Sequence, residues 1–180
     1  MRVLGLDPGS RRTGYGVVER NGNAYRCVAQ GTVAPRPKLE LAGRLHDIAT
    51  RIGAVMDEAR PECVVVEEAF YHESVRSTLV LGHVRGALLV IAAARGLEIA
   101  EYSPREIKLS VAGAGSATKD QVAFMVRRLL GLRGALSPDA SDALAAALCH
   151  LHRMRRSAPL RAASAAAARL QALLERRGSR

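Results

Sequence analysis

The sequence predicts an α/β domain with a mixed sheet flanked by helices. Three strand-like runs come first, strand and helix patterns then alternate, and helical periodicity dominates the rest. The chain has 180 residues, of which 48% are hydrophobic and 24% charged, close to soluble globular averages. These values exclude a disordered chain, a collagen-like chain and a disulfide scaffold. We expect one domain over residues 1–156 and an Ala- and Arg-rich basic tail over 157–180, disordered or helical.

The first part of the chain predicts three strands. We place them at residues 2–7, 14–20 and 24–33. Pro8–Gly9 interrupts the first run, and the Asn21-Gly22-Asn23 turn between the other two predicts a β-hairpin. Pro35 ends the third strand, because proline cannot donate to a sheet ladder.

The hydrophobic period then changes to that of a helix. Apolar residues recur three and four positions apart over residues 39–60, which predicts an amphipathic helix ended by Pro61. The β-branched run Cys63–Val66 is typical of a strand buried on both faces. The elements expected after it are helix 77–95 with Gly96 as its C-cap, strand 97–102, helices 104–111 and 118–130, and a helix capped by Ser137.

Charge suggests a polyanionic partner. Lysine and arginine number 27 against 17 aspartates and glutamates, which gives a net charge of +10. Residues 151–180 carry eight arginines and one acid, or +7 of that total. A basic chain usually binds nucleic acid, although a basic tail that is merely solvated would give the same net charge. The longest apolar run, Ala87–Ala94, is shorter than the about 20 residues that span a bilayer, so we expect no membrane partner.

Cysteine usage indicates a reduced, cytoplasmic protein. The cysteines are odd in number, form no metal-ligand pattern and are interpreted as reduced thiols; they are Cys27, Cys63 and Cys149. Four of the histidines form no metal-binding set either; they are His72, His83, His150 and His152. The N-terminus runs directly into strand-like sequence without the pattern of a signal peptide.

Four carboxylates are the candidate metal-binding residues of the sequence. Asp7 and Glu67 each follow an apolar strand, and open α/β sheets place ligand sites at the carboxyl ends of their strands. Asp139 and Asp142 are three residues apart at a helix start, so they share one helical face. Converging carboxylates repel unless a cation is bound, and Mg²⁺ and Mn²⁺ prefer oxygen ligands. Two such ions about 4 Å apart can cleave a phosphodiester.

Each carboxylate also has an ordinary structural interpretation. Asp7 before Pro8–Gly9 fits a turn acid, and Glu67 fits the first exposed residue after a buried strand. Asp139 fits a first-turn acid that interacts favourably with the helix dipole. Spacing alone therefore leaves open whether the four side chains converge.

Seven segments run in order and register from about Arg2 to His152. They are Leu6-Asp7-Pro8-Gly9-Ser10, Thr13-Gly14-Tyr15-Gly16-Val17, Val66-Glu67-Glu68-Ala69-Phe70, Leu81-Gly82-His83-Val84-Arg85-Gly86, Tyr102-Ser103-Pro104-Arg105-Glu106-Ile107-Lys108, Gly115-Ser116-Ala117-Thr118-Lys119 and Asp139-Ala140-Ser141-Asp142-Ala143-Leu144-Ala145. Together they resemble the RuvC-type Holliday junction resolvases. Each segment alone is weak evidence for the family, but the ordered set is highly specific for it. The tail lies outside the resemblance.

The resemblance implies a ribonuclease H-like fold with a five-stranded sheet, and a homodimer. It implies resolution of four-way DNA junctions in recombination and repair by paired symmetric nicks, with two Mg²⁺ ions per subunit that Mn²⁺ can replace. It also implies a branch-migration partner, the RuvA–RuvB complex. The family's catalytic and metal-binding acids fall on the four carboxylates already described, Asp7, Glu67, Asp139 and Asp142.

The resemblance also implies that three further residues contact DNA. Lys108 and Lys119 match lysines that bind DNA phosphate, and Phe70 matches an aromatic residue that distorts the junction near the cut. A solvated lysine and a loop anchor are the corresponding structural alternatives. Arg76 and Arg85 fit either a phosphate contact or a dimer surface.

Three other functions remain to be distinguished. A branched-DNA binding module would share the basic charge but would not cut. An actin-like or sugar-kinase-like ATPase shares the early strand, acid and hairpin order, but this chain is short for two lobes and has no second phosphate loop. A ribonuclease acting on RNA–DNA hybrids differs only in substrate.

Overall fold

The structure is a computed structural model that describes residues 1–68 and 74–155. Phe70 and the expected tail at 157–180 lie outside the described residues. One mixed sheet has the strand order β3-β2-β1-β4-β5, with β1 antiparallel to β2 and parallel to β4. The strands are β1 Arg2–Asp7, β2 Thr13–Asn21, β3 Ala24–Val33, β4 Cys63–Glu67 and β5 Glu98–Tyr102. The predicted five-stranded mixed sheet is confirmed.

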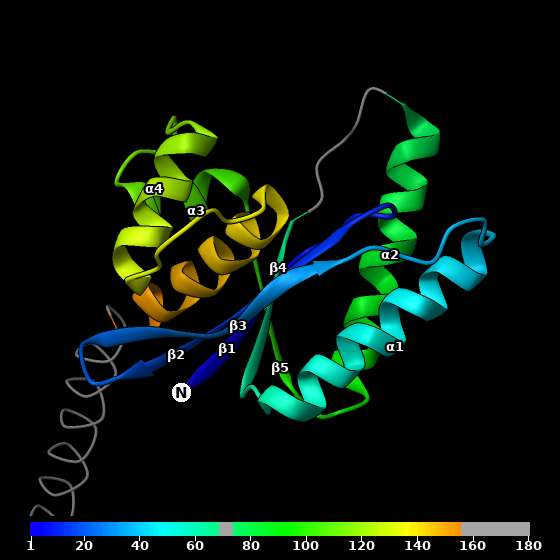
Figure 1. Cartoon of the computed structure of the whole chain (residues 1–180), viewed down its shortest axis with the longest axis horizontal. Helices are drawn as coiled ribbons and strands as arrows, with labels where there is room; N and C mark the ends of the chain where they lie inside the picture. The colour runs from blue at the N-terminus through cyan, green and yellow to red at the C-terminus, as the bar shows by residue number, and fades with distance from the viewer. Residues whose placement is uncertain (69–73, 156–180) are drawn as a thin grey trace, which may run out of the picture.

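Helices cover both faces of this sheet. They are α1 Leu41–Ala59, α2 Val75–Ala93, α3 Pro104–Ala112, α4 Lys119–Leu130 and an unlabelled helix over 138–155. Figure 1 shows α1 and α2 on one face, with α3, α4 and the yellow-to-orange 138–155 helix on the other. One predicted cap is wrong: α2 has its C-cap at Ala94, and Gly96 lies in the turn that follows.

The predicted N-caps of the later helices are confirmed. The Thr118 hydroxyl accepts a hydrogen bond from the Gln121 backbone, and the Gln121 side chain accepts one from the Thr118 N–H. The Ser137 hydroxyl accepts from the Ala140 N–H at 3.3 Å. Such caps satisfy otherwise unpaired helix donors and contribute about 1 kcal/mol each. The helix carrying Asp139 therefore begins at a position fixed by local chemistry.

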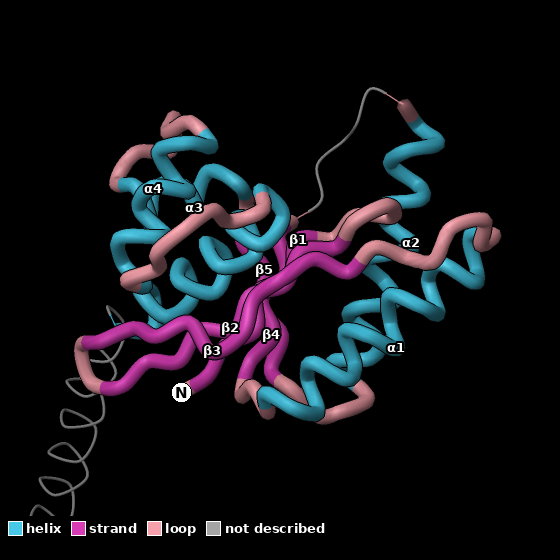
Figure 2. Tube along the Cα trace, in the orientation of Figure 1, coloured by secondary structure: helices cyan, strands magenta, loops and turns pink. Residues whose placement is uncertain are grey.

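Alternating side chains of the central strands divide the core into two layers. Leu4 of β1 packs with the α1 and α2 layer, whereas Val3 packs with the α3, α4 and 138–155 layer. In β4, Val64 belongs to the first layer and Val65 to the second. Figure 2 shows the strands between the two groups of helices. Because side chains alternate along a strand, Asp7 and Glu67 belong to the face that the 138–155 helix covers.

Glycines let that helix approach the sheet closely. A Cβ atom on Gly5 would lie 1.9 Å from the carbonyl oxygen of Ala143, and one on Gly14 would lie 2.0 Å from that of Asp139. Neither position therefore has room for a side chain. Gly14 is the register partner of Asp7, so this contact brings the start of the 138–155 helix next to Asp7.

The helix α2 combines a packed face with an apolar exposed one. Val84, Leu88 and Ala92 are fully buried in the layer shared with α1, whereas Leu79 and Val90 are 60% and 66% exposed. By length and composition alone, α2 is also long and apolar enough to cross a membrane, although its longest unbroken apolar run is short.

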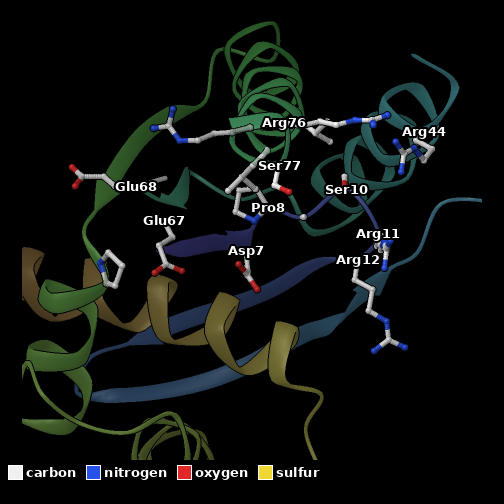
Figure 3. Close-up of a pocket in the computed structure, with 15 residues that line it drawn as sticks. Asp7, Pro8, Ser10, Arg11, Arg12, Arg44, Glu67, Glu68, Arg76 and Ser77 are labelled. Atoms are coloured by element: carbon white, nitrogen blue, oxygen red, sulfur yellow. The ribbon is translucent and has the colours of Figure 1, made fainter. Parts of the chain in front are cut away.

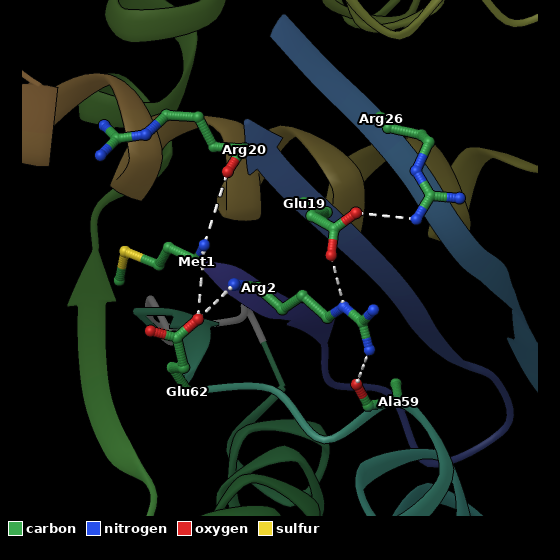
Figure 4. A network of polar contacts seen from close by, with 7 residues as sticks. All are labelled: Met1, Arg2, Glu19, Arg20, Arg26, Ala59 and Glu62. Carbon is green, nitrogen blue, oxygen red and sulfur yellow. Dashed lines mark hydrogen bonds and ion pairs between the residues drawn. The ribbon is translucent and has the colours of Figure 1, made fainter. Parts of the chain in front are cut away.

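An ionic network joins strands at the end of the sheet opposite Asp7. Glu19 accepts hydrogen bonds from Arg2 and Arg26, both at 2.7 Å, and Arg2 also donates to the carbonyl of Ala59 at 3.0 Å (Figure 4). The two arginines hold the pKa of Glu19 at about 2. The network ties β1, β2 and β3 to the end of α1.

Candidate active site

Asp7 and Glu67 lie side by side at the carboxyl ends of neighbouring parallel strands. Leu6 and Val66, the residues before them, are register partners. Both carboxyl groups point toward the 138–155 helix (Figure 3). They line a cavity of about 330 Å³, whose charged members are Asp7, Glu67, Asp142, Lys108 and Lys119. The convergence expected from the two strand ends is therefore present.

The 138–155 helix brings the other two carboxylates to the same place from its first turns. Asp139 lies against Gly14, and its Oδ2 atom is buried without a hydrogen-bond partner among the described residues. Asp142 accepts a hydrogen bond from Lys119, with 3.0 Å between Nζ and Oδ2, and its side chain is 23% exposed. The structure thus brings together all four predicted carboxylates.

Burial, together with repulsion between the carboxylates, raises the pKa of Asp7 and Glu67. Burial raises the pKa of Asp7 to about 7, with further contributions from Asp142, Glu67 and Asp139. Burial and the charge of Asp142 also raise the pKa of Glu67. An all-oxygen donor set with an unpartnered buried oxygen on Asp139 fits a hard divalent cation such as Mg²⁺ or Mn²⁺.

In the metal-free protein, Asp7→Asn is expected to raise the free energy of unfolding above pH 7, by up to about 4 kcal/mol. The pKa of Asp7 is raised from 3.8 to about 7 on folding, so its charged form opposes folding. This destabilisation is absent below about pH 4, grows as the pH rises, and is complete above about pH 7. Urea unfolding of both proteins in EDTA across this range measures it, and equal stabilities above pH 7 would contradict the raised pKa of Asp7.

Both predicted lysines lie at the cluster. The contact with Asp142 raises the pKa of Lys119, so its ammonium stays charged, while its side chain remains 78% exposed. Lys108 lines the same cavity, and its charge acts to lower the pKa of Glu67. Their placement suits contact with a bound phosphate, and that role remains a prediction. Phe70 lies outside the described residues.

A second, larger cavity of about 880 Å³ opens from the same two carboxylates, Asp7 and Glu67. Figure 3 shows Arg11, Arg12 and Arg44 to one side of Asp7, and Arg76 above it. These four arginines lie in α1, α2 and the turn after β1, and we call the part of the cavity that they line the arginine groove.

Sequence reasoning missed three members of the arginine groove, Arg11, Arg12 and Arg44. The available signal was the Arg11–Arg12 pair directly after a strand-end acid and its turn. Thr13 closes that turn, because its hydroxyl donates to the carbonyl of Gly9 at 2.8 Å. Arg85 lines the same cavity but forms an ion pair with Glu101 of β5, so part of its charge is already neutralised.

Comparison with known proteins gives one consistent match. Residues 3–150 match the family model described as crossover junction endodeoxyribonuclease RuvC. The proteins of that name from Halorhodospira halophila and Bordetella avium are 48% and 46% identical, covering 93% and 91% of this chain and 99% and 92% of theirs. The solved structure of Thermus thermophilus RuvC in complex with Holliday junction substrate superposes with a TM-score of 0.82 at 36% identity, covering 87% of this chain and 96% of that one.

Proposed function

This chain belongs to the RuvC family of crossover junction endodeoxyribonucleases, and we propose that it resolves four-way DNA junctions by paired symmetric nicks in recombination and repair. The observation that carries the proposal is the convergence of four carboxylates beside a basic groove. The family match also separates this function from the binding-module, ATPase and ribonuclease alternatives. The relatives are named as crossover junction endodeoxyribonucleases.

The four carboxylates would hold two Mg²⁺ ions, for which Mn²⁺ can substitute. When bound, such ions activate a water for attack on phosphorus and stabilise the departing 3′ oxygen. The strand ends fix Asp7 and Glu67, while the capped helix fixes Asp139 and Asp142, so the ligands are in position before DNA arrives. Lys119 is free to move from Asp142 to a DNA phosphate once a cation neutralises that carboxylate.

The arginine groove supplies the surface that DNA needs. Arg11 and Arg12 are exposed beside the carboxylates, and Arg44 and Arg76 extend the positive surface away from them. Arginine binds phosphate through a planar, bidentate group, so a strand lying in this groove would pass directly over the cluster. Phe70, in the segment after β4, is proposed to unstack bases near the cut, as expected from the resemblance.

The cleavage of two strands requires two sites, which we propose come from a homodimer. A twofold dimer presents identical sites related by symmetry, which matches the symmetry of a four-way junction. The exposed apolar side chains of α2, among them Leu79 and Val90, are the proposed contact. A cytoplasmic location and the RuvA–RuvB branch-migration complex as a partner complete the proposal.

Leu79→Glu is expected to convert the dimer to a monomer, because it places a charge in the proposed apolar contact. The matched control is Leu109→Glu in α3, since Leu109 is similarly exposed, at 56% against 60%, but lies on a different helix. Sedimentation velocity measures both. The assignment of α2 predicts a monomer for Leu79→Glu only, and a dimer for both variants would contradict it.

A cleavage assay on matched substrates tests the proposed function. A four-way junction and a linear duplex containing the same strand sequence are each incubated with Mg²⁺, Mn²⁺ or EDTA. We expect cutting of the junction with either metal, little cutting of the duplex, and none in EDTA. Tight junction binding without a cut in any metal would instead favour a branched-DNA binding module.

A further inference from the structure

A second group of metal-binding side chains lies at the other end of β4 from Glu67. Cys63 is the first residue of β4, and its register partner Glu98 is the first residue of β5. His150 comes from the 138–155 helix, which packs over the same face of the sheet. One ligand atom from each of Cys63, Glu98 and His150 lies within 4.8 Å of the other two. We call these three residues the Cys63 cluster.

The imidazole of His150 is the unusual member of the cluster. The residue is only 3% exposed, and its Nδ1 atom is 2.9 Å from the hydroxyl of Tyr102. Its other ring nitrogen, Nε2, is buried and has no hydrogen-bond partner within the part of the chain that the structure describes. A buried nitrogen left in this state destabilises a fold unless something binds it. The contact with Tyr102 also fixes the ring, which directs the available nitrogen.

We propose that the Cys63 cluster is a second metal site, selective for a borderline-soft divalent cation such as Zn²⁺. Thiolate, imidazole and carboxylate are the three side-chain groups that zinc binds in proteins. A sulfur ligand discriminates against Mg²⁺, which prefers oxygen. The chain would then hold two chemically distinct sites, an all-oxygen cluster at Asp7 and a mixed one at Cys63. Glu98 is exposed, so the ion has access from solvent.

Tyr102 supports the site from behind the ligands. A metal-bound histidine commonly directs its second ring nitrogen to an oxygen that fixes the ring, and the Tyr102 hydroxyl occupies that position. Binding forms the sulfur–metal bond as the Cys63 thiol releases its proton to solvent. No electron is transferred, because Zn²⁺ is redox-inert.

The site would fasten the 138–155 helix to the sheet. His150 is eight residues after Asp142, or about 12 Å along the same helix. Cys63 is similarly on the same strand as Glu67. A bound ion would therefore join, at a distance from the reaction, the two elements that carry Glu67, Asp139 and Asp142. The role of this ion would be to position the helix on the sheet, and the proposal of the site does not depend on the proposed nuclease reaction.

Titration of the full-length protein with Co²⁺ tests the proposal directly. Co²⁺ replaces Zn²⁺ at such sites, and a cobalt–thiolate bond gives an ultraviolet charge-transfer band that carboxylate ligands do not give. Saturating Mg²⁺ is included to occupy the all-oxygen cluster. We expect one equivalent of Co²⁺ to produce the band, and Zn²⁺ to displace it.

Two cysteine variants assign the band to its sulfur. Cys63→Ala is expected to abolish it, whereas Cys149→Ala, which removes another buried cysteine, is expected to retain it. Two further variants keep the sulfur in place and so test the site even if Cys63→Ala fails to fold. Tyr102→Phe should weaken Co²⁺ binding by about 10- to 100-fold, and Glu98→Gln, which removes a ligand, by at least as much. Absence of the band in the unmodified protein would overturn the proposal. So would an undiminished band in Cys63→Ala, or its loss in Cys149→Ala alone.

Thermal unfolding gives an independent readout. Zn²⁺ should raise the Tm of the unmodified protein, because an ion that binds only the folded chain stabilises it. The increase should be absent in Cys63→Ala and present in Asp7→Asn, which leaves the Cys63 cluster intact. An equal increase in Cys63→Ala, or its loss in Asp7→Asn only, would place the ion at the all-oxygen cluster and overturn the assignment.

Discussion

Asp7→Asn is expected to abolish cleavage of a four-way junction while leaving junction binding intact. Asp7 lies close to the other three carboxylates: burial raises its pKa most, and the charges of Asp142, Glu67 and Asp139 raise it further. An amide has nearly the same shape but no charge, so the variant loses affinity for a divalent ion. We expect the cleavage rate to fall about 10³-fold or more, which corresponds to about 4 kcal/mol of transition-state stabilisation.

Single-turnover cleavage and a gel-shift titration measure the two effects of Asp7→Asn separately. Asp120→Asn is the matched control, since it removes an exposed carboxylate from the first turn of α4 without touching the cluster. We expect the control to cut at nearly the unmodified rate. Cleavage by Asp7→Asn within a few fold of the unmodified protein would remove this residue from the mechanism.

Gly14→Ala is expected to impair both stability and cleavage. The added Cβ would lie 2.0 Å from the carbonyl oxygen of Asp139 and 3.0 Å from its Cβ, so the start of the 138–155 helix must move away from the sheet. Overpacking of this kind costs about 3 kcal/mol. The same movement separates Asp139 from Asp7, so cleavage should fall even where the variant remains folded.

A glycine in a helix provides the control for Gly14→Ala. A Cβ on Gly43 of α1 would meet Leu39 at 3.4 Å, an ordinary van der Waals contact. Gly43→Ala should therefore stabilise the protein by about 0.5–1 kcal/mol, because alanine favours helix more than glycine does. Urea unfolding and a cleavage assay at a temperature where each variant is folded separate the two effects. A fully active and stable Gly14→Ala protein would contradict the close approach.

Local signals in the sequence were sufficient for most of the fold. The hairpin, the strand boundaries and the caps at Thr118 and Ser137 depend on neighbours within a few residues, and the structure has them, with the strand ends within one residue of the prediction. The proximity of Asp7 and Glu67 follows from two parallel strands that end together. The end of α2 was misplaced because Gly96 is a good C-cap residue, but the helix already ends at Ala94.

Features that depend on packing between distant elements could not be predicted from the sequence. The approach of Asp139 to Asp7 requires a position without a side chain at Gly14, and a lone glycine in a strand does not reveal what it faces. Arg44 joins Arg11 and Arg12 only because α1 packs beside the turn after β1. Likewise, Cys63 and His150 form no sequence motif, because register and helix packing alone bring them together.

The most direct test of the central claim, that the four carboxylates cut junction DNA with bound divalent ions, maps every nick. A synthetic four-way junction is prepared in four versions, each labelled at the end of one strand, and is incubated with the protein in Mg²⁺, Mn²⁺ or EDTA. We predict nicks at symmetric positions on one opposed pair of strands, which disappear in EDTA and in Asp7→Asn. Cutting that persists in EDTA, or that persists unchanged in Asp7→Asn, would contradict the claim.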